Sequence, residues 1–223
     1  MNLEDFTEDE AKKIEENQQE EKAFRKALSK LLAGDSQVAS KPLLIGVTPN
    51  AIECCIEKKG MDLVITKAVI KKCMRAEVRD EEGKQTKKSG HGLTEQQLND
   101  IVWAIKRPVM IIKGSQPDSL AVMTDLKDNE DRYIFTFIAI DQAGATANVN
   151  MIASTYGRNN LEDYLQRCVE SDMILAINKE KVNDVCLSIG GHFSEATALI
   201  NFDNTIAYTL KSVKRKNEDL AEK

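Results

Sequence analysis

Seven side chains of this chain suit chemistry at a phosphodiester bond, and they fall in four short stretches of the sequence. They are Lys71 and Lys72, then His91, then Ser115, and finally Ser154, Tyr156 and Arg158. Histidine has an ordinary pKa that allows proton transfer near neutral pH, and lysine and arginine bind phosphate oxygens. RNA transesterification uses such a set without a metal: a base takes the 2′-hydroxyl proton, a cation stabilises the phosphorane, and an acid protonates the leaving oxygen.

Each candidate also has a structural interpretation that the sequence leaves open. A histidine in a loop, lysines on a solvated helix face, and serines in a turn or at a strand end are all common without a catalytic role. The tyrosine and the arginine equally suit packing and capping. The second histidine, His192, is a rival to His91, and spacing does not choose between them. Only convergence of the candidates on one spot favours the chemistry.

His91 precedes a well-specified helix start. Thr94 and Gln97 have the capping-box pattern, and Leu93 and Leu98 occupy the two positions of a hydrophobic staple. Apolar residues follow at helical spacing, and a proline at position 108 ends the helix. We therefore expect the helix start to fix the geometry of the histidine.

The two lysines lie on a short predicted helix over residues 67–75, which Thr66 caps after a strand at 62–65. Before that strand, the sequence "TPNAIECCIEKKG" predicts a helix with Thr48 as cap, Pro49 at the first helical position and a glycine beyond its end. The charged residues 76–90 lack periodicity, so we expect them to form an exposed loop.

The segments after position 108 change to the period of strands. Strands are predicted at 109–113, 120–124, 133–140 and 149–154, followed by a helix at 159–171, a strand at 173–177 and a short helix at 179–187. The short connections between the four strands favour an antiparallel meander. Helices first and strands afterwards predict an α+β fold in which N-terminal helices pack on an antiparallel sheet.

Composition and charge predict one folded domain with an extension. A chain of 223 residues, 42% of them hydrophobic, suits a single core. A helix predicted from Glu8 to Ala33 is polar in its first half and carries an apolar stripe in its second, which faces either the body or a partner helix. Residues 34–42 resemble a linker, so we place an acidic helical extension at 1–40 and the domain at 41–223.

The net charge of −5 is uneven, because residues 1–22 carry nine acids against three lysines and leave the remainder at +1. A near-neutral body is compatible with a local phosphate-binding patch. The five cysteines, without a C-x-x-C spacing, predict free thiols and neither a disulfide framework nor a zinc site. The sequence has no long apolar run and its first residues are acidic, so we expect a soluble cytoplasmic protein.

The order of the motifs resembles a known family. These motifs are "IGVTPNAI", "DLVITKAVIKK", "GHGLTEQQLNDI", "RPVMIIKGSQPDSLAVMTDL", "VNMIASTYGR" and "DMILAINKEK", which span Leu43 to Lys181, with weaker similarity toward the C-terminus. In this order they are similar to the phage MuF C-terminal domain and related phage nuclease-like domains. That family is assigned to the superfamily of barnase, EndoU, the ribonuclease colicins and RelE (BECR).

The resemblance implies a barnase-, EndoU- or RelE-like α+β fold and metal-independent cleavage of RNA, without a cofactor, by a toxin or effector of phage or mobile-element origin. It places the family's lysine on Lys71 or Lys72, its histidine on His91, its first serine on Ser115, and its serine-aromatic-glycine-basic run on Ser154, Tyr156, Gly157 and Arg158. His192 matches none of its motifs. Gly90 departs from the pattern, because a basic residue is expected there.

These inferences combine into one hypothesis. His91, Lys72 and Ser154 form the expected catalytic set, with the histidine transferring the proton. Lys71, Ser115, Tyr156 and Arg158 are the residues expected to bind and orient RNA. Besides RNA, the expected partners are an immunity protein or a phage structural protein, and no membrane. The competing hypothesis is a catalytically inactive phage accessory or binding module that keeps the same fold.

Overall fold

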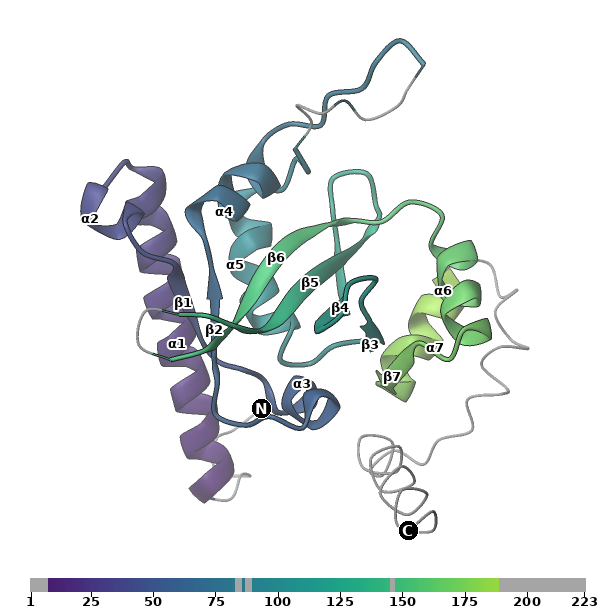
Figure 1. Ribbon diagram of the computed structural model, residues 1–223, viewed down its shortest axis with the longest axis horizontal. Coiled ribbons are helices and arrows are strands. Elements are labelled where there is room, and N and C mark those ends of the chain that lie inside the picture. Colours follow the sequence, from purple (N-terminus) through teal and green to yellow (C-terminus); the bar gives the residue numbers. More distant parts are fainter. Residues whose placement is uncertain (1–7, 83–85, 87–89, 145–146, 189–223) are drawn as a thin grey trace.

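The computed structural model of the chain describes residues 8–82, 86, 90–144 and 147–188 (Figure 1). Its strands form one sheet of seven in the order β1-β2-β6-β5-β4-β3-β7. The strands are β1 Leu43–Val47, β2 Asp62–Ile65, β3 Met110–Lys113, β4 Ser119–Lys127, β5 Tyr133–Gln142, β6 Val149–Gly157 and β7 Ile174–Ile177. The helices are α1 Glu8–Leu32, α2 Ser36–Ala39, α3 Asn50–Ile56, α4 Lys67–Met74, α5 Glu95–Ala104, α6 Leu161–Glu170 and α7 Lys179–Ser188.

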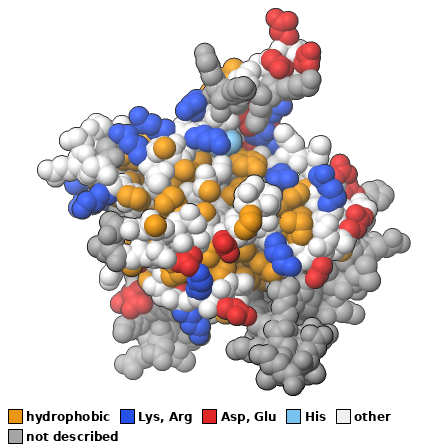
Figure 2. All heavy atoms as spheres, viewed as in Figure 1, with side chains coloured by type: hydrophobic (Ala, Val, Ile, Leu, Met, Phe, Trp, Pro, Cys, Tyr) orange, Lys and Arg blue, Asp and Glu red, His pale blue; other side chains and the backbone are white. Residues whose placement is uncertain are grey.

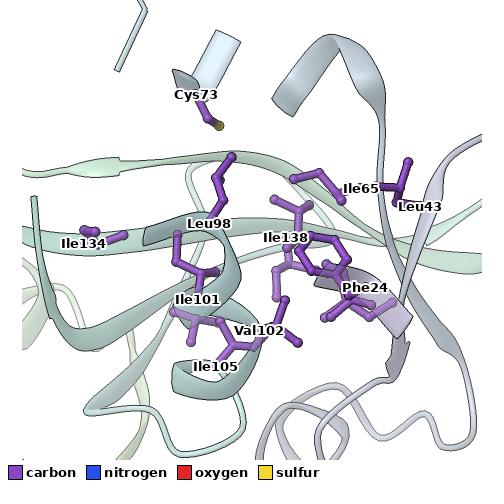
Figure 3. Packing of buried hydrophobic residues seen from close by; sticks show 14 of the residues in the cluster. Phe24, Leu43, Ile65, Cys73, Leu98, Ile101, Val102, Ile105, Ile134 and Ile138 are labelled. Carbon is purple, nitrogen blue, oxygen red and sulfur yellow. The ribbon is translucent and has the colours of Figure 1, made fainter. Parts of the chain in front are cut away.

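Two hydrophobic clusters lie on opposite faces of the sheet, because alternate residues of a strand point to opposite sides. On β5, Ile134 and Ile138 belong to the cluster that contains the buried residues of α1, α4 and α5. Phe135, between them, belongs to the cluster that contains the buried residues of α6 and α7. Figure 3 shows part of the first cluster, in which Leu98, Ile101 and Val102 of α5 lie near Ile138 of β5.

The second half of α1 packs against the body. Of the predicted apolar stripe of Phe24, Ala27, Leu28, Leu31 and Leu32, Phe24, Leu28 and Leu31 are buried in the first cluster, while Leu32 is exposed. Lys106, which lies just after α5, donates to the Glu20 carboxylate of α1 at 2.6 Å. In Figure 1 this helix runs along the β1 side of the sheet. The alternative that the stripe faces a partner helix is therefore wrong, because the body covers it.

The predicted α+β class and the meander are confirmed. Strands β3, β4, β5 and β6 pair antiparallel with their sequence neighbours. The expectation of a purely antiparallel sheet is wrong, because β2 pairs with β6 in parallel, with Val64 opposite Met151. Two helices and three strands separate β2 from β6 in the chain, which is the long connection that a parallel pair requires.

Local predictions differ from the structure at three places. Thr48 does not cap α3; its hydroxyl accepts a hydrogen bond from the buried Asn150 side chain at 2.9 Å, and Pro49 stands at the N-cap. The segment expected to be a linker contains the short helix α2, capped by the Asp35 carboxylate. Helix α5 ends at Ala104, before the proline that was expected to end it. None of the described helices combines the length and the apolar character needed to cross a bilayer.

Candidate functional site

The segment Gly90–Leu93 lies against the end of α4. Its backbone N–H groups donate to α4 and the residues just after it: His91 N to the Lys72 carbonyl at 3.2 Å, and Leu93 N to the Cys73 carbonyl at 2.9 Å. A Cβ at Gly90 would overlap the backbone of Arg75. Close backbone contact therefore explains why glycine stands where the family resemblance led us to expect a basic residue.

The start of α5 fixes this segment from its other end. Thr94 Oγ1 accepts from the Gln97 amide at 3.1 Å, and the Gln97 side chain accepts from the Thr94 amide at 2.8 Å, which confirms the predicted capping box. Leu93 and Leu98 are both buried, as the staple requires. In addition, the Asn129 side chain donates to the Gly92 carbonyl at 3.1 Å.

The parallel pairing of β2 and β6 brings this segment next to the end of β6. Parallel strands have their carboxyl ends at the same edge, α4 follows β2 directly, and α4 packs on β6. Ser154 and Tyr156 lie near the end of β6 and on the same face of the sheet, because they are two residues apart. The Ser154 hydroxyl is 3.2 Å from Nε2 of His91, and the Tyr156 ring lies 4.8 Å from the imidazole, centroid to centroid.

The surroundings of His91 favour its neutral form. Burial, the Lys72 ammonium and the Arg132 guanidinium lower the pKa of His91 below its ordinary value of 6.5, in that order of importance, while the charge of Glu77 acts in the opposite direction. The net effect is a histidine that is unprotonated at neutral pH. A neutral imidazole that hydrogen-bonds a hydroxyl is able to accept a proton.

Aromatic rings continue from His91 across the sheet. Tyr156 stacks on Phe137 with centroids 5.0 Å apart, and Phe137 stacks on Phe135 at 6.4 Å. At the far end of this row, the Arg158 guanidinium lies 3.4 Å from the centroid of the Tyr164 ring. Figure 2 shows hydrophobic side chains gathered over the middle of one face, with charged side chains of both signs around them. The described part of the chain thus has a cation at each end of an aromatic row.

Some candidates lie apart from this cluster. Ser115 is exposed in the turn after β3, and β4 and β5 separate β3 from β6. Lys71 and Lys72 are both exposed on α4, and of these two neighbours it is Lys72 whose charge acts on His91. His192 lies outside the described residues. The structure thus brings together His91, Ser154 and Tyr156, with the charge of Lys72 beside the histidine.

A charged junction that was not predicted from the sequence lies next to His91. Arg132 donates to Glu77 at 2.8 Å and to Asp128 at 2.6 Å, and the side chains of the three residues are 10%, 13% and 2% exposed, respectively. We expected Glu77 in an exposed loop; that expectation is wrong for its side chain, because Arg132 from the turn before β5 covers it. The one hint of this junction in the sequence is the glycine at position 157, since a Cβ there would overlap the Asp128 carboxylate.

No group of three or more His, Cys, Asp or Glu side chains within the described residues has an arrangement suited to a metal ion. Burial raises the pKa of the Cys73 thiol to about 11 and that of the Cys55 thiol to about 12, so both are protonated at neutral pH. Both cysteines are free thiols. They are therefore poor nucleophiles and poor metal ligands as they stand.

Comparison with known families gives one match. The model of the phage MuF C-terminal domain matches residues 82–184, just under half of the chain. This supports the predicted resemblance to that family over the segment that carries His91, Ser154 and Arg158. The match does not include α4 or Lys72. No curated protein and no solved structure matches the chain.

Proposed function

We propose that this chain contains a metal-independent endoribonuclease domain of phage or mobile-element type, in which His91 is the general base. The observation that carries the proposal is the contact of 3.2 Å between His91 Nε2 and the Ser154 hydroxyl, at a histidine whose pKa is lowered. RNA carries its own nucleophile, the 2′-hydroxyl, so its cleavage needs a base, a cation and an acid but no metal-bound water.

The proposed roles follow from the contacts. A substrate 2′-hydroxyl takes the place that the Ser154 hydroxyl occupies at Nε2, and its proton passes to His91 while its oxygen attacks the phosphorus. Lys72, whose charge acts on the imidazole, stabilises the negative phosphorane. The proton then passes to the leaving 5′-oxygen, which yields a 2′,3′-cyclic phosphate. Tyr156 holds the imidazole ring in place, and Arg158 binds the RNA backbone further along the strand.

Similarity to the phage MuF C-terminal domain supports a phage context for this activity. A relation to barnase, EndoU, the ribonuclease colicins and RelE, the action as a toxin, and a neutralising partner remain parts of the proposal. The chemistry of the site does not depend on them.

The experiment is RNA cleavage by the purified full chain in EDTA. We expect a mixed-sequence RNA to be cut by the wild type and His91→Ala to lose about 10²- to 10⁴-fold in rate, the usual contribution of a general base. Lys72→Met removes the cation and is expected to reduce the rate. Because the charge of Lys72 lowers the pKa of His91, the variant should also lose activity at a higher pH than the wild type as the pH falls below neutrality.

The matched control is His192→Ala, which removes the other histidine of the chain. We expect this variant to cleave at the wild-type rate. Equal cleavage by the wild type and His91→Ala would contradict the proposed role of His91. A folded wild type that binds RNA without cutting it would instead favour the binding module that retains the fold.

A further inference from the structure

The junction of Glu77, Asp128 and Arg132 joins three segments that meet at His91. Glu77 belongs to the loop after α4, Asp128 and Arg132 belong to the turn between β4 and β5, and Gly157 at the end of β6 leaves room for the Asp128 carboxylate. In Figure 1 the turn from β4 to β5 lies near the end of β6, and the ion pair of Glu77 with Arg132 ties the loop after α4 to this turn. The same turn contacts the histidine segment directly, through the Asn129 side chain and the Gly92 carbonyl.

Glu77 lies close to the Gly90–Leu93 segment by its backbone as well. The Gly90 amide donates to the Ala76 carbonyl at 3.0 Å, and a Cβ built on Gly92 would lie 3.9 Å from the Glu77 nitrogen. Its carboxylate is clamped, since Arg132 donates to Oε1 at 2.8 Å and Arg79 to Oε2 at 3.0 Å. Burial alone would raise the pKa of Glu77, but these two guanidinium groups outweigh it and hold the pKa below its ordinary value.

The charged and titratable groups around His91 come from four elements. They are Lys72 of α4, Glu77 of the following loop, Arg132 of the turn before β5 and Tyr156 of β6. The two cations oppose a positive charge on the imidazole, and Glu77 favours it. A histidine that acts as a general base becomes positively charged when it accepts a proton. A fixed carboxylate nearby therefore stabilises this protonated imidazole.

We propose that Glu77 is a positioning residue of this site: its carboxylate, clamped by Arg132 beside the Gly90–Leu93 segment, stabilises the imidazolium that forms when His91 takes a hydroxyl proton. Glu77 does not itself contact the substrate or exchange a proton. Arg132 holds the Glu77 carboxylate in place, and Asp128 acts one step further away, because it holds the Arg132 guanidinium. This inference rests on the proposed function for its purpose, while the coupling of Glu77 to His91 is measurable without RNA.

The test is an NMR pH titration of the His91 ring in the full chain, with the His91 signal assigned by its loss in His91→Ala. Glu77→Gln keeps an oxygen that accepts from Arg132 and removes the charge. We expect the pKa of His91 to be lower in this variant than in the wild type, and cleavage near neutral pH to fall on the order of 3- to 10-fold because the base is weaker. Glu77→Asp keeps the charge but places it one methylene further back, so it is expected to lower the pKa of His91 and the rate by less than Glu77→Gln does.

The matched control is Glu130→Gln, which removes a more exposed carboxylate that pairs with the same Arg132 at 3.0 Å. It is expected to leave the pKa of His91 and the rate unchanged. An equal His91 pKa in the wild type and Glu77→Gln overturns the inference, whatever the rates are. If Glu77→Gln does not fold, the aspartate variant decides: its carboxylate is drawn back, so an unchanged His91 pKa overturns the inference and a lowered one supports it. If the wild type does not cleave RNA, the proposed function fails, and the titration still decides the coupling.

Discussion

Replacing Gly157 by alanine tests the packing that holds the site together. The added Cβ would overlap Oδ2 and Cγ of Asp128, a side chain that is 2% exposed. Asp128 has little freedom to move away, because its carboxylate accepts from the Glu130 amide at 2.9 Å, the Arg132 amide at 3.0 Å and Arg132 Nε at 2.6 Å. The substitution therefore forces either a broken ion pair or a displaced strand.

The magnitude follows from the burial of this pair. Breaking a buried ion pair costs about 3 to 5 kcal/mol, and partial relaxation places the expected loss near 3 kcal/mol. For a chain of this size, that corresponds to a fall in Tm of about 6 to 12 °C. Urea unfolding followed by circular dichroism measures the free energy directly.

A double-mutant cycle shows whether Asp128 is the cause. In an Asp128→Ala background the obstructing carboxylate is absent, so Gly157→Ala is expected to cost less than about 1 kcal/mol. A cost that stays near 3 kcal/mol in that background would refute the reasoning, as would a Gly157→Ala variant as stable as the wild type.

Three further predictions concern α1, α5 and pH. Leu28→Ala is expected to reduce the free energy of unfolding by about 2 to 5 kcal/mol, because Leu28 is fully buried, whereas Leu32→Ala, at a residue 41% exposed, should cost less than about 1 kcal/mol in the same urea assay. Thr94→Ala removes the cap of α5 and is expected to cost about 1 kcal/mol; no measurable loss in urea unfolding would contradict the capping role. Since the folded state lowers the pKa of His91, the wild type is expected to lose stability as the pH falls from 6.5 through that pKa. His91→Gln should lose less stability over the same pH range in denaturation curves. An equal loss of stability in the two proteins would argue against the shift.

The sequence predicted most of the elements, because their signals are local. Thr66 and Thr94 cap α4 and α5 as expected, since a side-chain oxygen three residues before an amide satisfies that amide wherever the helix lies. The strands of the meander were predictable for a similar reason, because short connections force neighbours to pair. Thr48 misled us because the buried Asn150, distant in sequence, takes its hydroxyl as a partner.

The residue types of the site were predictable, but their meeting was not. His91 and Ser154 come together through the parallel pairing of β2 with β6, and no local pattern specifies which strand lies beside β2. Glu77 lies in a stretch of charged residues typical of an exposed loop, and its burial depends on Arg132 from another part of the chain. Ser115 illustrates the opposite case, where a suitable residue type lies in an exposed turn on the other side of two strands.

The central claim is that His91 removes a proton from the 2′-hydroxyl of RNA, and the ends of the cleavage products test it most directly. We expect the wild type in EDTA to cut an RNA oligonucleotide to give a 2′,3′-cyclic phosphate and to leave the same oligonucleotide intact when its 2′-hydroxyls are methylated. The His91→Ala variant is expected to lose both cleavage and the cyclic product. Cleavage of the methylated strand, or cyclic product formed equally well by His91→Ala, would contradict it.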